Sequence, residues 1–330
     1  MVGLSLKEKL LLSLHNLLST GVVGDKQYAN RYKGFVGELS FIETFQTSML
    51  SGCWSIPHQK GDTINSQEKS VVYITSDAVT ERETALFSRF WAIEPSNIFI
   101  IEVDGDVLEW KSETILGTDL TILKPIFKIY TMNKETSELE SHGEDLSFLS
   151  NCFEDSNSPR KAKFIPDEVF EKFNWRLAQY SLRNLADLYA SRYFFEGVIG
   201  FSRGIPVDID FFWWSGNMWH MLEVKEKDLS KREPRGFGMD IRRIRHMRKL
   251  SRFLELPFLY VVRQVNNQTE RLHMGWHYID IEEFHANTKG LTPIEGGFGM
   301  RSTRSSNPTK VCPLSFFGDF ELLLEEAFKH

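Results

Sequence analysis

The sequence predicts an α/β protein in two parts: a C-terminal core with a mixed central sheet flanked by helices, and a smaller α/β domain before it. Three observations support this. Apolar residues recur at helical spacing near the N-terminus, β-branched and aromatic runs alternate with helical stretches, and the second half reads helix, three strands, helix, strand. The chain has 330 residues, 42% of them hydrophobic, which is ample for packed cores and suggests two domains at roughly 150 residues each.

The N-terminal domain is expected over residues 1–132. Residues 5–50 predict two helices separated by a Gly-containing loop. The runs Val71–Ile74 and Ile98–Ile101 predict strands, and the stretch 80–91 between them predicts a helix. We expect this domain to select a target or to bind a partner.

An acidic, polar stretch follows. Residues 133–163 lose apolar content and carry seven acidic side chains, so they predict a solvated linker. The C-terminal domain is expected over 164–330. Its first helix is predicted to begin at Pro166-Asp167-Glu168, because proline suits a first turn and acids favour the positive helix end. The helix continues, with a break, towards Tyr193. The elements expected after it are strands over 195–201, 206–214 and 218–225, a helix over 240–255, and strands over 258–265 and 271–279.

Two of these strands flank Gly216-Asn217, which suits a two-residue hairpin turn. With these two residues as the loop, Asp210 lies opposite Glu223. Asp208 then lies opposite Lys225. The two-residue period of a strand places all four side chains on one face of the sheet, where charged groups among apolar neighbours are costly unless they have partners.

A divalent cation would neutralise Asp210 and Glu223, and hard oxygen ligands of this kind suit Mg²⁺. Lys225 would orient or deprotonate an attacking water, and the metal would stabilise negative charge on a phosphoryl oxygen. The pattern therefore predicts a phosphodiesterase site that activates water. The alternative is an ordinary ion pair between Asp208 and Lys225, with the other two acids at a solvated sheet end.

Asp210, thirteen residues before Glu223-Val-Lys225 on adjoining apolar strands, resembles the pattern of the PD-(D/E)XK nuclease superfamily, which has the restriction-endonuclease-like fold. Pro206 and Asp208 add to the likeness, although a literal Pro-Asp pair is absent. The resemblance covers about residues 165–265, the α-β-β-β-α-β core, and leaves the N-terminal half unaccounted for.

The resemblance implies that Asp210, Glu223 and the backbone carbonyl of Val224 bind Mg²⁺, for which Mn²⁺ can substitute. It also implies that Lys225 assists the water. The family often adds an acid from the helix before the sheet. The further candidate ligands are Asp208, Glu168 and Glu171, with Asp187 and Glu196 as competitors. Each of these acids could equally be a helix-start charge or part of a surface ion pair.

A second Glu-x-Lys sequence, Glu109-Trp-Lys111, is not expected to form such a site. It lacks an aspartate on a preceding strand at a comparable distance, and no basic helix follows it.

The net charge of −6 excludes a polybasic arm, yet residues 225–252 hold eleven Lys or Arg against four acids. Such a segment favours polyanion binding. On a helix its basic residues share an arc of about 120°, which predicts a face that contacts DNA phosphates beside the metal site. The alternative is a solvated face balanced by acids elsewhere. The predicted DNA-binding residues are Arg242, Arg245, Arg248, Lys249, Arg252, Lys227 and Arg235, with Arg301 and Arg304 in a second loop.

We therefore expect a Mg²⁺-dependent DNA endonuclease, with double-stranded DNA favoured. Its size and domain plan suggest bacterial restriction or phage defence, by family analogy. Cutting both strands favours a homodimer or a partner subunit. The alternatives are a transposon-end or repair nuclease on the same core, an RNA-directed nuclease, and a catalytically inactive nucleic-acid-binding module. Three scattered cysteines without a CxxC pair indicate a reducing cytoplasm. No apolar run approaches the roughly 18 residues of a membrane helix, so no membrane partner is expected.

Overall fold

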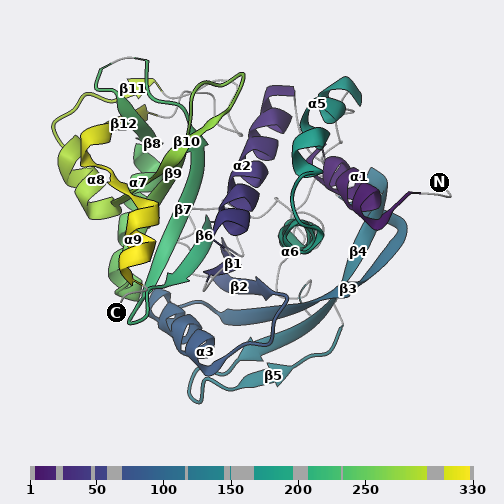
Figure 1. The fold of residues 1–330 in the computed structure, drawn as a ribbon. Coiled ribbons are helices and arrows are strands. Elements are labelled where there is room, and N and C mark those ends of the chain that lie inside the picture. The colour runs from purple at the N-terminus through teal and green to yellow at the C-terminus, as the bar shows by residue number, and fades with distance from the viewer. Residues whose placement is uncertain are drawn as a thin grey trace. The chain divides into compact units, whose positions relative to one another are not determined.

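The computed structural model describes residues 4–19, 25–45, 49–57, 69–115, 118–144, 149, 167–195, 207–231, 233–295 and 308–327. Over these residues the chain is a mixed α/β protein in which sheets are flanked by helices, as predicted (Figure 1). It divides into two compact units. The first unit comprises Met1–Phe45 and Ser51–Asp208, and the second comprises Gln46–Leu50 and Ile209–His330. None of the helices in these described ranges is both long and apolar enough to cross a membrane.

Within the described residues, the first unit contains the helices predicted over 5–50 and 80–91, the broken helix predicted from residue 166 towards Tyr193, and five strands. The helices are α1 (Leu6–Ser19), α2 (Asp25–Thr44), α3 (Glu81–Ser88), the 3₁₀ helix η1 (Arg89–Ile93), α5 (Asp167–Leu177) and α6 (Leu182–Tyr193). The strands are β1 (Met49–Pro57), β2 (Lys69–Thr75), β3 (Asn97–Ile115), β4 (Thr118–Met132) and β5 (Leu139–Ser141). They lie in the order β1-β2-β3-β4-β5, and only the β2–β3 pair is parallel.

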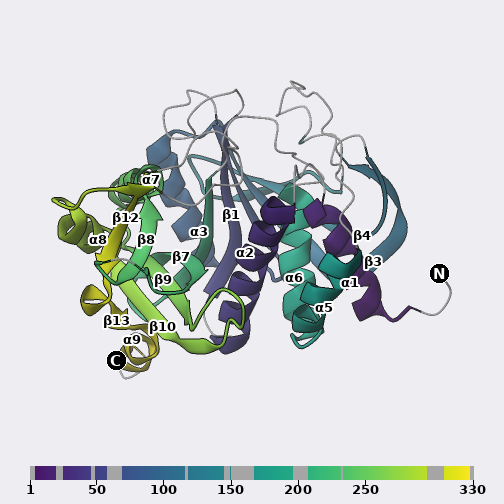
Figure 2. The same cartoon turned by 90° about the horizontal axis from the view of Figure 1, so that it is seen from above.

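The two faces of this sheet are covered by different helices. Val72 and Ile74 of β2 belong to a core shared with α1, α2 and α6, and Figure 2 shows these three helices gathered together with α5. The next residue along, Tyr73, points the other way and stacks on Phe87 of α3 at 4.3 Å between ring centroids. Alternation along one apolar strand therefore supplies both layers of the core.

The division between the units differs from the predicted linker over 133–163. Strand β5 lies within that stretch and pairs with β4, and α5 and α6 both belong to the first unit. The C-terminal segment of the second unit consequently begins at Ile209 rather than at residue 164. Residues 145–148 and 150–166, and residues 196–201 of the strand predicted over 195–201, lie outside the described residues.

The second unit carries a main sheet in the order β13-β10-β9-β7-β6 and a separate sheet β11-β12-β8. Strands β7 and β9 are parallel. The strands are β6 (Val207–Trp214), β7 (Trp219–Lys227), β8 (Gly236–Asp240), β9 (Phe258–Val265), β10 (His273–Asp280), β11 (Ile294–Glu295), β12 (Pro308–Pro313) and β13 (Gly318–Asp319). The helices are α7 (Ile241–Leu254), α8 (Ile281–Thr288), the 3₁₀ helix η3 (Leu314–Phe316) and α9 (Phe320–Ala327).

The β6–β7 hairpin has the predicted register. Phe211 pairs with Leu222, and the ladder runs to Trp214 opposite Trp219, which leaves Gly216-Asn217 as the two-residue loop. Gly216 has a φ of 97°. A glycine with positive φ at the first loop position is typical of a type II′ turn, whose twist matches that of the two strands.

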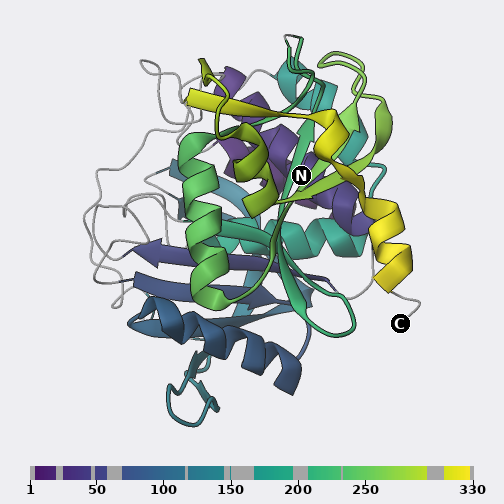
Figure 3. The ribbon, with the colours of Figure 1, turned by 90° about the vertical axis from the view of Figure 1, so that its left-hand side faces the viewer.

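Helix α7 also agrees with its prediction, with Asp240 as N-cap and Glu255 as C-cap. The apolar side that the sequence assigns to the sheet is buried, and it consists of Ile244, Met247, Leu250 and Leu254. Helices α7 and α8 cover one face of the main sheet, where Phe284 of α8 contacts Tyr260 of β9. Helix α9 covers the other, where Phe320 contacts Trp213 of β6. Figure 3 shows α7 and α9 on either side of these strands.

Candidate functional site

The hairpin brings the three predicted catalytic side chains together. The Nζ atom of Lys225 lies 3.0 Å from Oδ2 of Asp210 and 2.8 Å from Oε1 of Glu223. One ammonium group therefore contacts both carboxylates. This is the convergence that the predicted register requires, because Asp210 and Glu223 follow directly on the last ladder pair.

Both carboxylates are buried beneath their cationic partners. Asp210 is 6% exposed and Glu223 is 1% exposed, whereas the side chain of Lys225 is 35% exposed. Asp210 Oδ2 also accepts a hydrogen bond from the backbone N–H of Val224 at 2.8 Å. This bond ties the acid of one strand to the main chain of the other. It also offsets part of the cost of removing the carboxylate from water.

A residue outside the hairpin completes the group. Arg243, in the first turn of α7, forms an ion pair through Nη2 with Oε2 of Glu223, so both oxygens of that carboxylate contact cations. Its backbone N–H donates to Oδ1 of the N-cap Asp240 at 2.7 Å. The cap thus fixes the helix start from which the guanidinium reaches Glu223. The formal charges of Asp210, Glu223, Lys225 and Arg243 cancel.

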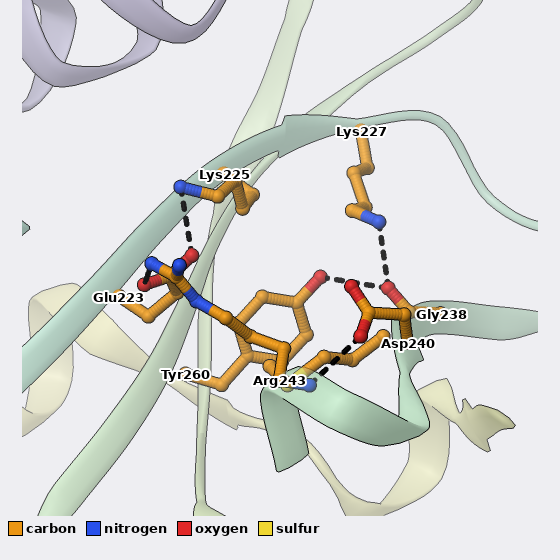
Figure 4. Close-up of a pocket in the computed structure, with 8 residues that line it drawn as sticks. Glu223, Lys225, Lys227, Gly238, Asp240, Arg243 and Tyr260 are labelled. Atoms are coloured by element: carbon orange, nitrogen blue, oxygen red, sulfur yellow. Dashed lines mark hydrogen bonds and ion pairs between the residues drawn. The ribbon is translucent and has the colours of Figure 1, made fainter. Parts of the chain in front are cut away.

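A cavity of about 170 Å³ adjoins this group (Figure 4). Its lining residues are Glu223, Lys225, Lys227, Gly238, Met239, Asp240, Arg243 and Tyr260. Strand alternation explains the three from β7, since residues 223, 225 and 227 share one face. On the side away from Glu223, the carbonyl of Gly238 accepts hydrogen bonds from Lys227 at 2.6 Å and from the hydroxyl of Tyr260 at 3.1 Å.

Two cavity groups have displaced pKa values. Burial lowers the pKa of the Lys227 ammonium to about 8, and the nearby charge of Lys225 acts in the same direction. Burial also raises the pKa of the Tyr260 phenol. Lys227 therefore loses its proton at a lower pH than an ordinary lysine does, and displaced pKa values of this kind cluster at functional sites.

No family model, curated protein or solved structure matches this chain.

The donor set suits a hard cation. Two buried carboxylates already converge on a positive charge, and oxygen ligands of this type are those of Mg²⁺. Within the described ranges, no group of three or more His, Cys, Asp or Glu side chains gathers as a metal cluster. The ligands available in this group are thus Asp210, Glu223 and the backbone carbonyl of Val224.

The additional predicted ligands are distributed over three elements. Asp208 lies two residues before Asp210 on β6, and Glu171 is exposed on α5 of the first unit. Asp187, on α6, lies 3.9 Å from Arg183. The side chain of Glu168, and all of Glu196, lie outside the described residues.

The second Glu-x-Lys sequence has a different setting. In the backbone register of the β3–β4 ladder, position 109 is paired with position 124, and position 111 with position 122. No carboxylate opposes either position, in agreement with the sequence argument against a site there.

The predicted DNA-binding arginines of α7 fall into two groups. Arg248 and Arg252 both pair with Glu282 of α8, at 2.7 and 2.9 Å. Arg242 and Arg245 are exposed. Of the remaining predicted residues, Lys249 has its Nζ atom 5.6 Å from the ring centre of Phe253. Arg235 is exposed, and Lys227 lines the cavity. Arg301 and Arg304 lie outside the described residues.

Sequence reasoning missed the parts played by Arg243 and Tyr260. Arg243 was visible only as one charge in a basic run. Its position three residues after the capping aspartate, at the start of a helix that follows Glu-x-Lys, is the signal that could have selected it. Tyr260 lies opposite Glu223 in the parallel β7–β9 register, which a single sequence does not reveal.

Proposed function

We propose that this chain is a Mg²⁺-dependent DNA endonuclease built on a restriction-endonuclease-like core. The observation that carries the proposal is the convergence of two buried carboxylates, Asp210 and Glu223, on the ammonium of Lys225 beside a cavity with further cations. Buried acids are costly to keep in a fold, and here Glu223 lines a cavity that a phosphate group could enter. Double-stranded DNA is the favoured substrate, and restriction or phage defence the favoured role.

In this proposal Asp210, Glu223 and the Val224 carbonyl hold the cation. A divalent cation bound there supplies a water of lowered pKa and stabilises negative charge on a phosphoryl oxygen. Lys225, as an ammonium, orients the attacking water and stabilises the hydroxide that forms, and the proton of the water passes to solvent. The partial exposure of the Lys225 side chain leaves its ammonium accessible to water and substrate.

Positive charges would align the substrate. Lys227 and Arg243 line the cavity, and a guanidinium pairs well with phosphate oxygens. Arg242 and Arg245 extend positive charge along the exposed side of α7. Such contacts fix the position of a nucleic-acid backbone without reading its sequence.

A second candidate function is supported by the charge balance. Lys225 and Arg243 already neutralise both carboxylates, so the group is satisfied without any metal. A nucleic-acid-binding module that has lost catalysis would look the same. This candidate predicts DNA binding that weakens with salt and no cleavage with any divalent cation.

Incubation of the full chain with plasmid, single-stranded DNA and RNA tests the proposal. Parallel reactions contain Mg²⁺, Mn²⁺ or EDTA. Cleavage of the plasmid with either metal, and none with EDTA, is the expected result. Cleavage of RNA alone would redirect the proposal to an RNA nuclease. Binding without cleavage under every condition would contradict it in favour of the inactive module.

A further inference from the structure

We propose that Arg243 and a divalent cation compete for the Glu223 carboxylate, and that a DNA phosphate draws Arg243 away, so that substrate and cation bind cooperatively. The inference rests on the proposed function and adds a form of regulation to it. Arg243 would act as an internal counter-ion that keeps the metal site weak until substrate arrives.

Access to the Glu223 carboxylate is limited by its two cationic partners. This carboxylate is almost fully buried, and its two oxygens contact Lys225 and Arg243. The two cations are the partly exposed members of the group, at 35% and 25% of their side chains. A cation that enters from solvent or from the cavity therefore meets Glu223 on the side already taken by positive groups.

The net charge of the group opposes the binding of a divalent cation while Arg243 is in place. The group is neutral with Arg243 in place, so a divalent cation added to it would leave two uncompensated positive charges in a partly buried position. Like charges at such short range repel strongly where the effective dielectric constant is low. Movement of Arg243 away from Glu223 removes one positive charge from the group, and the phosphate that draws it neutralises that guanidinium. The excess around the bound cation then falls from two positive charges to one.

The guanidinium of Arg243 can move although its backbone is held. The backbone of Arg243 is held by the cap at Asp240, but its guanidinium is at the end of a long, partly exposed side chain that lines the cavity. Neighbouring Arg242 is exposed on the same helical turn. A phosphate at this turn lies near the positive helix end and gives the guanidinium a bidentate partner in exchange for Glu223.

Linkage makes the effect reciprocal. If DNA removes the competitor of the cation, DNA tightens cation binding and the cation tightens DNA binding by the same factor. The Arg243→Gln variant removes the competitor permanently, so its cation affinity should be high already without DNA.

Calorimetric titration with Ca²⁺ tests this on the full chain, with and without a short DNA duplex. Ca²⁺ serves as a hard cation that takes oxygen ligands. In the wild type the duplex should tighten Ca²⁺ binding by about tenfold. R243Q alone should bind Ca²⁺ about tenfold more tightly than the wild type, with little further gain from the duplex. The control K289Q, which removes an exposed positive charge without touching Glu223, should behave as the wild type.

An R243Q protein whose Ca²⁺ affinity and duplex response equal those of K289Q would overturn the inference and leave the proposed function standing. No Ca²⁺ binding by any protein, even with the duplex, would instead overturn the proposed function. If circular dichroism shows that R243Q is misfolded, R243K replaces it, because lysine keeps the charge with a shorter reach. R243K should show intermediate tightening, and wild-type behaviour of R243K would overturn the inference.

Discussion

Strand β7 carries one ion cluster on each of its faces, and the two clusters differ in the exposure of their charged groups. On one face lies the open cluster, which consists of Asp210, Glu223, Lys225 and Arg243. On the other face lies the closed cluster, which consists of Glu226, Arg263 and Arg271.

The clusters differ in access. In the open cluster the acids are buried while the cations are partly exposed beside a cavity. In the closed cluster Glu226 and Arg271 are both buried, and the exposed fractions of their side chains are 1% and 5%. Arg263 donates to Glu226 at 2.7 Å. Burial of a charged group therefore does not by itself mark a functional site. What distinguishes the candidate site is that its charges can be reached.

The largest expected effect concerns the open cluster. D210N, E223Q and K225M should each lower Mg²⁺-dependent cleavage by roughly a thousandfold or more, because they remove a cation ligand or the group that orients the attacking water. Plasmid-cleavage rates measure the loss. E109Q, in the other Glu-x-Lys sequence, should cut like the wild type. Equal loss in E109Q would show that the assay reports folding rather than chemistry.

The closed cluster should respond in stability instead. E226Q leaves the buried guanidinium of Arg271 and the partly buried guanidinium of Arg263 without this counter-charge. Removal of one partner from a buried ion pair costs about 3–5 kcal/mol. Urea denaturation measures the loss of unfolding free energy. D228N, at the end of the same strand, should cost less than about 1 kcal/mol. Weakened Ca²⁺ binding in folded E226Q would contradict the division between the clusters.

Lys227, which lines the cavity beside the open cluster, should make the unfolding free energy depend on pH. Its pKa is lowered to about 8 from the 10.5 of an ordinary lysine. Between these pH values the unfolded chain binds a proton that the folded chain does not. Stability should therefore rise with pH through this window, by about 1–3 kcal/mol relative to K227M, which lacks the group. Unfolding free energies of both proteins at pH 7 and pH 10 measure it, and parallel behaviour of the two would refute the shifted pKa.

The smallest effects are expected on the surface of α7. R242Q and R245Q should each weaken duplex binding a few-fold and reduce the dependence of log affinity on log salt by about 1. R252Q should change less, because Glu282 already engages that guanidinium. Fluorescence anisotropy at several salt concentrations measures these differences. A larger effect from R252Q than from R242Q would place the DNA on another part of the helix.

The hairpin could be predicted because its information is local. Alternating apolar residues fix which side chains share a face, and Gly216-Asn217 fixes the register. The confirmed pairing of Phe211 with Leu222 follows from these two facts. Helix α7 and strand β9 were predictable for the same reason, since each has a strong apolar period and clear ends.

Features that depend on distant partners were not predictable. Strand β8 contains Gly236 and Gly238, which weaken strand propensity. Gly236 is nevertheless required, because a Cβ there would lie 1.9 Å from the carbonyl oxygen of Cys312 on β12. The sequence likewise gives no sign that Glu282 binds two arginines of α7, or that Arg243 reaches Glu223.

The position of the Arg243 guanidinium depends on the first turn of α7, which Asp240 caps. The Asp240 carboxylate caps α7 and holds the N–H of Arg243, and the same residue lines the cavity. Fraying of that first turn would carry the guanidinium away from Glu223 without any change in the hairpin. The strength of one cap, worth about 1 kcal/mol, would then set how often the two acids lose a partner, and local hydrogen exchange at Arg243 would report the frequency.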